Sequence, residues 1–340
     1  MAARDSPLEY LKLFRLQTGA TTAVAPVIGY LVIAAQTGYN IDLFEIVLIF
    51  SIGILMHIFE FVLNEYVDIE VDKLSPDLAE KPLVKGTVSP AAALAVVFGA
   101  LILTYILTIL FFFNLWTLIF ITLSFEFGAI YDIHGKRFAG SDVTLGLWIF
   151  FFCLFGASIV SVEFTGLLYL VAGLGFFQIF FNNAVEGGIK DADHDAVGGA
   201  RTLAYVMGVR VKNGKLTIPN AFKLVSYAIK LSHISIIIII IYISVFKISN
   251  LMDYIHLFLI LILIIIILST LHSFINEIEF KRNKLKRIFS IHEIATYYLA
   301  PIILLQLLGI VPVLCLLILP LGWYIFLNLI LYGKPLEPRV

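Results

Sequence analysis

Long apolar runs constrain this chain more than any other feature of its sequence. A helix that crosses the hydrocarbon core of a bilayer needs roughly 20 mostly apolar residues. Soluble domains contain about 45–50% apolar residues, whereas 61% of these 340 residues are hydrophobic. The sequence therefore predicts an all-α integral membrane protein with about nine transmembrane helices, and it excludes a soluble globule, a disordered chain and a coiled coil. The predicted runs are Thr18–Ala35, Leu43–Leu63, Ala91–Phe112, Leu115–Ile130, Val143–Val162, Gly166–Phe181, Tyr227–Phe246, Ile255–Phe274 and Tyr297–Leu331.

The last run is unusually long and contains Pro301, Pro312 and Pro320. Proline removes a backbone donor and breaks or kinks a helix. The run is therefore either one kinked helix or two shorter pieces, and the side of the membrane on which the C-terminus lies depends on which it is.

Lysine and arginine are distributed very unevenly between the connectors. The N-terminus and every even-numbered connector contain basic residues, whereas the odd-numbered connectors contain only Lys247. Basic loops stay in the cytoplasm. We therefore expect a multi-pass protein whose N-terminus and long polar loops are cytoplasmic. No connector has room for a separate soluble domain, so we expect a single domain over residues 1–340. The longest polar connector, from Glu186 to Lys223, ends in a stretch rich in Gly, Asn and Pro at Lys212–Pro219, which we expect to be a loop.

Two acidic clusters interrupt the apolar pattern, each at the cytoplasmic end of a predicted span. In the first, residues 64–72, Asn64, Asp68 and Asp72 are four residues apart and share one helix face. In the second, residues 191–195, Asp191 and Asp195 have the same spacing. The even-numbered connectors place both clusters on one side of the membrane at similar depth.

Stacked carboxylates repel one another unless a cation lies between them. Oxygen ligands suit a hard cation such as Mg²⁺, which usually binds one or two carboxylates together with phosphate oxygens of a substrate. The two clusters therefore predict a metal-bridged diphosphate site with Asp68, Asp72, Asp191 and Asp195 as ligands. Asn64 either binds the metal or orients Asp68. Neighbouring basic residues are candidates for holding the outer phosphate oxygens: Lys81, Lys85, Lys136, Arg137, Lys190 and Arg201.

These motifs resemble those of the UbiA superfamily of intramembrane prenyltransferases. The first family motif, N-D-x-x-D-x-x-x-D, reads here from Asn64 to Asp72 and is followed by the basic stretch Lys81–Gly86. The second, D-x-x-D-x-x-x-D, reads Gly188 to Asp195 and is followed by Gly199-Ala200-Arg201-Thr202-Leu203. Tyr131, Lys136 and Arg137 resemble a Tyr and basic residues that follow the fourth span, and Arg15 matches a common family Arg.

The sequence departs from the family pattern at two motif positions. Glu65 replaces the usual Asp of the first motif, which keeps the charge on a longer arm. Gly188 replaces the first Asp of the second motif, so one carboxylate is missing. Glu186 is near in sequence but is displaced by about 200° around a helix from position 188. These changes bear on the number of metal ions and on the acceptor.

The resemblance implies a bundle of nine helices around a central cavity that is capped on the cytoplasmic side. It implies that a prenyl group is transferred from a polyprenyl diphosphate, with two Mg²⁺ ions expected as cofactor. Catalytic roles would fall to Asp68, Asp72, Asp191, Asp195, Tyr131 and Lys136. Diphosphate binding would fall to Asn64, Lys81, Lys85, Arg137, Lys190, Arg201 and Arg15. The expected partners are the donor, a lipid or aromatic acceptor and membrane lipid, and no nucleic acid.

The acceptor stays open at this point. The second motif looks closest to archaeal members that build ether lipids, which favours geranylgeranyl transfer to a prenylated glycerol phosphate. The alternatives are an aromatic acceptor of a quinone pathway, a UbiA-type terpene cyclase, and a cation or lipid carrier without enzymatic activity. A transporter is disfavoured because transporter sites lie near the bilayer midplane, whereas both acidic clusters lie at the ends of spans.

Overall fold

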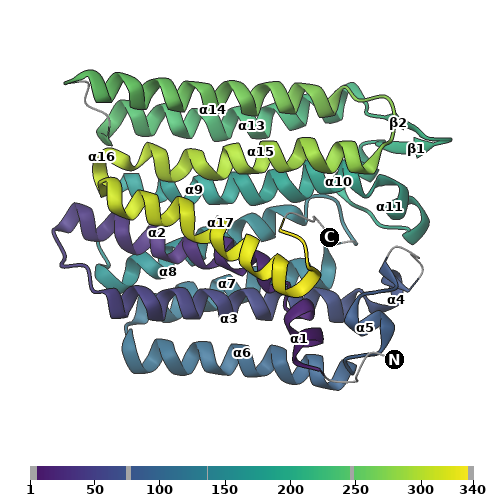
Figure 1. Cartoon of the computed structure of the whole chain (residues 1–340), viewed down its shortest axis with the longest axis horizontal. Coiled ribbons are helices and arrows are strands. Elements are labelled where there is room, and N and C mark those ends of the chain that lie inside the picture. The colour runs from purple at the N-terminus through teal and green to yellow at the C-terminus, as the bar shows by residue number, and fades with distance from the viewer. Residues whose placement is uncertain (1–5, 74–77, 136, 246–248, 336–340) are drawn as a thin grey trace. The chain divides into compact units, whose positions relative to one another are not determined.

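Helices make up almost all of the chain in the computed structural model, which describes residues 6–73, 78–135, 137–245 and 249–335. The chain divides into two compact units. Unit 1 comprises Met1–Ile133, Leu147–Phe164 and Leu316–Val340, and unit 2 comprises His134–Gly146 and Thr165–Cys315. Figure 1 labels their elements.

Nine helices among the described residues are long and apolar enough to cross a membrane, which confirms the predicted class and number. They are Leu16–Thr37, Leu43–Val67, Pro90–Phe111, Leu115–His134, Asp142–Val160, Gly166–Lys190, Asn220–Ile243, Leu251–Ile275 and Ile310–Tyr332.

Unit 1 is built mainly from long helices that begin at capping residues. Its elements are α1 (Pro7–Leu13), η1 (Leu16–Thr18), α2 (Gly19–Thr37), α3 (Leu43–Val67), α4 (Ile69–Asp72), α5 (Pro82–Lys85) and α6 (Pro90–Phe111), with most of α7 (Leu115–His134), α8 (Asp142–Val160) and α17 (Ile310–Tyr332). Asp42 caps α3 by accepting from the Phe44 amide at 2.8 Å. Ser89 caps α6 by accepting from the Ala92 amide at 3.2 Å, with Pro90 at the first helical position. Both are favoured starts, because they satisfy free amides of the first turn.

Small residues let α2 pack very closely against α3 and α8. A Cβ added to Gly53 of α3 would lie 2.4 Å from the Ala23 Cα of α2, and one added to Gly156 of α8 would lie 1.8 Å from the Pro26 carbonyl oxygen. Both contacts are too short for any side chain. Because lipid tails are as apolar as side chains, such close backbone packing is a main source of helix association in membranes.

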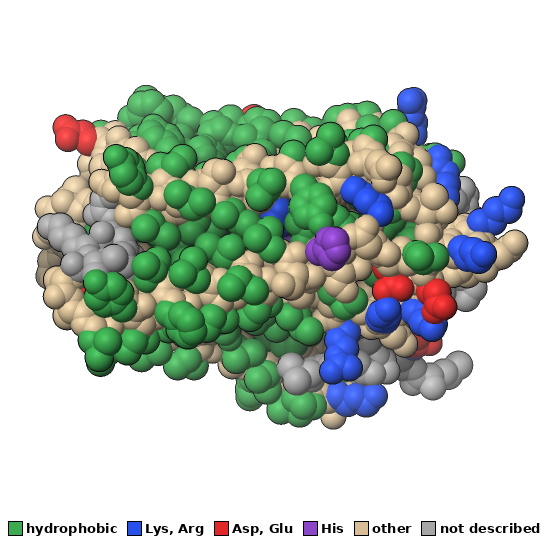
Figure 2. All heavy atoms as spheres, turned by 90° about the horizontal axis from the view of Figure 1, so that it is seen from above, with side chains coloured by type: hydrophobic (Ala, Val, Ile, Leu, Met, Phe, Trp, Pro, Cys, Tyr) green, Lys and Arg blue, Asp and Glu red, His purple; other side chains and the backbone are tan. Residues whose placement is uncertain are grey.

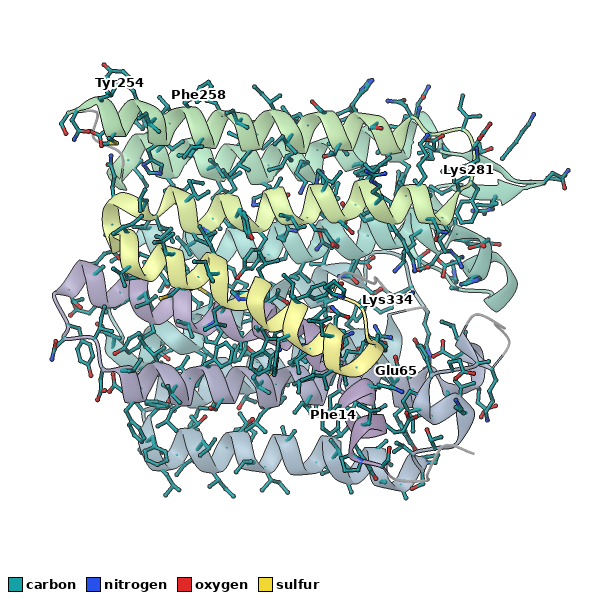
Figure 3. All side chains as sticks on the ribbon, in the orientation of Figure 1. Phe14, Glu65, Tyr254, Phe258, Lys281 and Lys334 are labelled. Carbon is teal, nitrogen blue, oxygen red and sulfur yellow. The ribbon has the colours of Figure 1, made fainter. Side chains whose placement is uncertain are left out.

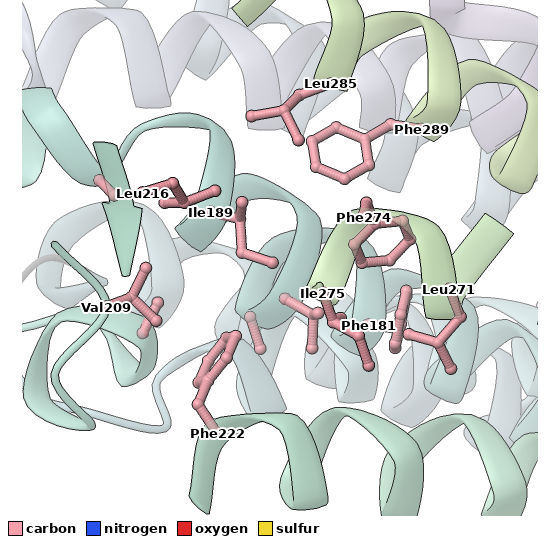
Figure 4. Packing of buried hydrophobic residues seen from close by; sticks show 14 of the residues in the cluster. Phe181, Ile189, Val209, Leu216, Phe222, Leu271, Phe274, Ile275, Leu285 and Phe289 are labelled. Carbon is pink, nitrogen blue, oxygen red and sulfur yellow. The ribbon is translucent and has the colours of Figure 1, made fainter. Parts of the chain in front are cut away.

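Unit 2 consists of long helices that pack side by side and a cap of short elements. Its helices are α9 (Gly166–Phe181), the π-helical turn η3 (Asn182–Gly187), α10 (Gly188–Lys190), α11 (Ala192–Gly198), α12 (Leu203–Val206), α13 (Asn220–Ile240), the π-helical turn η4 (Ile241–Val245), α14 (Leu251–Ile275), α15 (Arg282–Ile303) and α16 (Leu305–Leu308). α13 packs on α9 and α14 packs on α15. Figure 4 shows the buried apolar cluster in which Phe181 of α9, Phe274 of α14 and Phe289 of α15 meet.

A small hairpin forms where the sequence suggested a plain loop. β1 (Arg210–Lys212) pairs antiparallel with β2 (Lys215–Thr217) through Asn213 and Gly214. Both turn residues have positive φ, at 50° and 74°, which is the typical conformation of an Asn-Gly hairpin turn. The loop expected at Lys212–Pro219 was therefore wrong, since the Asn-Gly pair was a readable hairpin signal.

The final apolar run is divided into shorter helices and is not one kinked helix, which decides between the two expected alternatives. α15 ends at Ile303, α16 follows, and α17 begins at Ile310. The division falls at Gly309, whose φ of 79° and ψ of 171° interrupt the helix. Pro301 and Pro320 lie inside α15 and α17, so the prolines are not the point of division.

The long helices of unit 2 carry an apolar outer surface. Figure 2 is seen from the side of α14, and hydrophobic side chains cover most of α13 and α14 while Lys and Arg side chains gather at the end beside β1 and β2. Tyr254 and Phe258 point away from α14 (Figure 3) and are 60% and 62% exposed. Exposed apolar side chains of this kind fit a surface that faces lipid.

Candidate active site

The first acidic motif lies where α3 passes into α4. The Asp68 amide donates to the Asn64 carbonyl at 3.0 Å, and the Asp72 amide donates to the Asp68 carbonyl at 2.8 Å. The helical hydrogen-bond pattern thus continues through the motif. Asn64, Asp68 and Asp72 therefore follow one another at one-turn intervals in unit 1.

A network of ion pairs surrounds Glu65, next to this stripe. Arg15 donates to Glu65 Oε1 through Nε at 3.0 Å and also through Nη2. Lys81 Nζ lies 3.0 Å from the same oxygen and 2.6 Å from Asp72 Oδ2. Glu65 is 4% exposed, so the two cations balance a carboxylate that water hardly reaches. Figure 3 labels Glu65 near the end of α3.

Charged residues of this network shift the pKa of Asp72, which lies beyond the end of the membrane-spanning part of α3. Burial raises the pKa of Asp72 above its usual value, and the charges of Glu65 and Asp68 act in the same direction, while Lys81 opposes them. Among the predicted diphosphate-binding residues of unit 1, the structure brings Arg15 and Lys81 to the motif. It leaves Lys85 apart from them, because Lys85 pairs with the exposed Glu80 at 2.5 Å.

Two buried carboxyls near Asn64 were not selected as site residues from the sequence. Asn64 Nδ2 donates to Asp132 Oδ1 of α7 at 3.1 Å. Glu60, one turn before Asn64, lies against α7 so closely that a Cβ on Gly128 would be 2.1 Å from its Oε2. Neither carboxyl oxygen of Glu60 has a hydrogen-bond partner among the described residues. Asp132 follows Tyr131 directly, and an acidic residue at the end of the apolar run Leu115–Ile130 was the signal available in the sequence.

The second acidic motif lies in unit 2, between η3 and α11. The Asp195 amide donates to the Asp191 carbonyl at 2.8 Å, which keeps these residues one turn apart. Asp195 Oδ2 accepts a hydrogen bond from Thr202 Oγ1 at 2.8 Å. Lys190 Nζ lies 3.5 Å from Asp191 Oδ2. The structure therefore brings Lys190 and both motif aspartates together within unit 2.

Packing explains the glycine at position 188. A Cβ added to Gly188 would lie 2.5 Å from the Ala204 Cβ of α12, so the carboxylate of the family pattern has no room here. Glu186 does not take its place at the motif. Its side chain is buried, and its charge interacts with Glu293 of α15 and Lys230 of α13.

The remaining predicted residues differ in their exposure. Arg137 and Arg201 are exposed, and Tyr131 is half-buried. Lys136 lies outside the described residues. Asp193, a residue of the second cluster without a predicted role, pairs with Arg282 Nη2 at 2.6 Å.

The donor chemistry of both motifs fits a hard cation. Asp68, Asp72, Asp191 and Asp195 supply carboxylate oxygens and Asn64 supplies an amide oxygen, the ligand types that Mg²⁺ prefers. Within the described part of the chain, no three His, Cys, Asp or Glu side chains form a group that could hold a metal ion unaided.

Comparisons with known proteins agree on one family. The model of the UbiA prenyltransferase family matches residues 23–291, which is most of the chain. No curated protein sequence matches the chain.

Several solved structures share the fold at low sequence identity. A digeranylgeranylglyceryl phosphate synthase has a TM-score of 0.65 at 17% identity, with 89% of this chain and 98% of that chain covered. A UbiA homolog from Aeropyrum pernix K1 in its apo form has a TM-score of 0.61 at 17% identity, covering 86% and 94%. A UbiA homolog from Archaeoglobus fulgidus bound to GPP and Mg²⁺ has a TM-score of 0.59 at 18% identity, covering 87% and 99%.

The matched segment contains both acidic motifs and eight of the nine candidate spans in whole or in part. The chain is therefore a multi-pass membrane protein that belongs to the UbiA prenyltransferase family.

Proposed function

We propose that this enzyme transfers a prenyl group from a polyprenyl diphosphate in a Mg²⁺-dependent reaction, and specifically a geranylgeranyl group to a prenylated glycerol phosphate. The observation that carries the proposal is the first motif. Asp68 and Asp72 offer oxygen ligands for a hard cation, and Lys81 and Arg15 are held beside them on Glu65. Carboxylates for a metal next to fixed cations for an anion are what a metal–diphosphate complex requires.

In this proposal the two motifs share one task. Asn64, Asp68, Asp72, Asp191 and Asp195 hold Mg²⁺, with two ions expected. When bound, Mg²⁺ supplies positive charge that stabilises the leaving diphosphate. Tyr131, Lys81, Lys190 and Arg15 bind or orient the diphosphate, with Lys85, Lys136, Arg137 and Arg201 as further contacts. The Archaeoglobus homolog bound to GPP and Mg²⁺ supports the pairing of a prenyl diphosphate with Mg²⁺ in a protein of this fold.

The reaction breaks the allylic C–O bond, and its electron pair leaves with the diphosphate. A lone pair of the acceptor hydroxyl forms the new C–O bond to the allylic carbon, and the hydroxyl proton is lost. The apolar helices exclude water, which would otherwise capture the allylic cation.

The proposed acceptor is a prenylated glycerol phosphate, and separate observations support it. A prenylated glycerol phosphate is supported by the fold shared with the digeranylgeranylglyceryl phosphate synthase and by the second motif with its Arg201-Thr202-Leu203 segment.

We further propose that both units act as one domain over residues 1–340, with the N-terminus and both motifs on the cytoplasmic side. The basic residues at the ends beside the motifs support that orientation.

Diphosphate release by the purified protein in detergent tests the proposal. The donor is geranylgeranyl diphosphate, with and without Mg²⁺. The acceptors are geranylgeranylglyceryl phosphate, 4-hydroxybenzoate, or none. The variants are Asp68→Ala and Asp191→Ala, with Glu70→Ala as the matched control, because Glu70 lies in the same segment but its side chain is 83% exposed and pairs with Lys73.

We expect release that needs Mg²⁺ and both aspartates, and that rises with the glycerol phosphate acceptor. A rise with 4-hydroxybenzoate instead would replace the proposed acceptor by an aromatic one. Release with a cyclised product and no acceptor would indicate a cyclase. Folded protein that releases no diphosphate from donors of several chain lengths would refute the enzymatic proposal and leave a carrier.

A further inference from the structure

The turn that carries Arg15 has an unusual backbone. Arg15 has φ 45° and ψ 40°, in the left-handed region. A side chain with a Cβ is sterically disfavoured there. In the described part of the chain, Asn213 is the other non-glycine residue with positive φ, and it lies in an ordinary Asn-Gly turn. Arg15 therefore needs contacts that hold its backbone, and such residues concentrate at functional sites.

Two side chains from distant parts of unit 1 hold this turn. His57 of α3 bonds the Arg15 carbonyl through Nε2 at 3.1 Å, and Trp323 of α17 donates from Nε1 to the Leu16 carbonyl at 2.6 Å. His57 Nδ1 lies 3.0 Å from Thr22 Oγ1. Because a carbonyl can only accept, Nε2 carries the proton and Nδ1 accepts from the Thr22 hydroxyl. Two consecutive carbonyls are thus fixed from two different helices.

The direction of this turn determines where the Arg15 guanidinium lies. The guanidinium bonds Glu65 Oε1, to which Lys81 also bonds, and Lys81 in turn bonds Asp72. A chain of contacts therefore runs from Trp323 through the Leu16–Arg15 backbone to a carboxylate of the first motif. If the turn relaxed, Glu65 would lose one of its two cations, and Lys81 would be drawn away from Asp72 towards Glu65.

We propose that Trp323, together with His57, is a positioning residue for the diphosphate site: it holds Arg15 in the left-handed conformation that keeps Lys81 beside Asp72. This inference rests on the proposed function for its effect on catalysis. It gives a role to α17, which lies beyond the segment matched by the family model, as does Arg15.

Trp323→Phe tests the role of the indole N–H with little change in packing. The ring contact with Phe50, at 5.8 Å between centroids, can be retained by phenylalanine. With geranylgeranyl diphosphate as the donor, KM rises about five- to tenfold, the scale of one lost hydrogen bond, and kcat stays within about twofold. Trp148→Phe is the matched control, because Trp148 is buried and its Nε1 has no hydrogen-bond partner among the described residues.

A double-mutant cycle shows whether Trp323 acts through Arg15. In an Arg15→Ala background, Trp323→Phe produces no further rise in the donor KM. An equal rise in both backgrounds would refute the proposal. If Trp323→Phe does not fold, His57→Phe replaces it in the cycle with the same expectation, because it removes the other donor that reaches the turn from a distant helix.

Hydrogen exchange of the ligand-free protein provides a readout that does not depend on activity. Trp323→Phe accelerates amide exchange in the peptide that spans residues 12–19, and Trp148→Phe does not. Unchanged exchange in Trp323→Phe would overturn the inference whatever the activity. Wild-type protein that releases no diphosphate would overturn the proposed function alone, and the exchange result would still decide whether Trp323 holds the turn.

Discussion

Replacing Glu65 with glutamine removes the negative charge on which Arg15 and Lys81 converge. The amide oxygen can still accept a hydrogen bond, so the substitution tests the charge more than the shape. Three N–H groups meet at Glu65 Oε1, two from Arg15 and one from Lys81. Two cations would then lie beside a neutral group with little access to water.

The burial of the Glu65, Arg15 and Lys81 side chains determines how much stability the substitution removes. Breaking a fully buried ion pair costs about 3–5 kcal/mol, and an exposed pair contributes about 0–1 kcal/mol. Glu65 is 4% exposed, whereas Arg15 and Lys81 are 17% and 20% exposed and can gain some hydration. Lys81 also keeps its bond to Asp72. We therefore expect Glu65→Gln to lower the free energy of unfolding by about 2–3 kcal/mol, between these two limits.

Reversible unfolding in mixed detergent micelles measures this loss. Glu65→Asp, which restores the residue usual in the family motif, keeps the charge on a shorter arm and should lose less than Glu65→Gln. Glu70→Gln is the matched control, and its exposed pair with Lys73 should contribute less than about 0.5 kcal/mol. Equal stability of Glu65→Gln and Glu70→Gln would show that the ion-pair network does not stabilise unit 1.

Three further predictions concern packing, buried charge and pH. Gly188→Asp should cost about 1–3 kcal/mol by overpacking against Ala204, and Ala204→Gly should recover part of it; a thermal midpoint equal to wild type would contradict the 2.5 Å contact. Glu60→Gln should leave the unfolding free energy unchanged or raise it, because a neutral amide is easier to bury than a carboxyl that finds no hydrogen-bond partner among the described residues; a loss above about 2 kcal/mol would contradict this. Burial alone would raise the pKa of Glu9, but hydrogen bonds from Lys12 and Thr87 hold it below its ordinary value of 4.5. The hydrogen bonds that lower the native pKa of Glu9 stabilise the fold above its ordinary value, and this stabilisation is lost as the pH falls through the native pKa. Thermal unfolding from pH 7 to 3 should therefore show a loss of stability in acid that is smaller in Glu9→Gln than in the wild type; identical pH profiles of the two proteins would argue against it.

The local periodicities of the sequence predicted much of the fold. Membrane-spanning helices are readable because each must satisfy its own backbone hydrogen bonds and carry an apolar surface. The one-turn spacing of Asn64, Asp68 and Asp72 follows from helix geometry alone, and the structure keeps that spacing. The division of the last apolar run was one of the two expected alternatives, but its position at Gly309 was not predicted, because the prolines were the expected breaking points. The hairpin at Asn213-Gly214 was not predicted, although an Asn-Gly pair is a hairpin signal.

The contacts that complete the site were not readable in this way. Asn64 and Asp132 are hydrogen-bonded although they lie 68 positions apart in the sequence, and Arg15 and Glu65 are bonded although they lie 50 positions apart. A basic residue near an acidic motif indicates a charge balance, but its sequence position does not say which carboxylate it will bond. The absence of a carboxylate at Gly188 was visible in the sequence, whereas its cause, the Ala204 side chain, was not.

The sequence by itself determined the membrane class, the number of spans and the spacing within each motif, because these depend on residues within a few turns of one another. Tertiary structure alone decided that Lys81 bridges Glu65 and Asp72, and that Trp323 bonds a carbonyl 307 positions before it. Such contacts depend on which helix faces pack together. That choice is made by the close approach of backbones at small residues and by the need of buried charges for partners, and neither has a period that can be read along the chain.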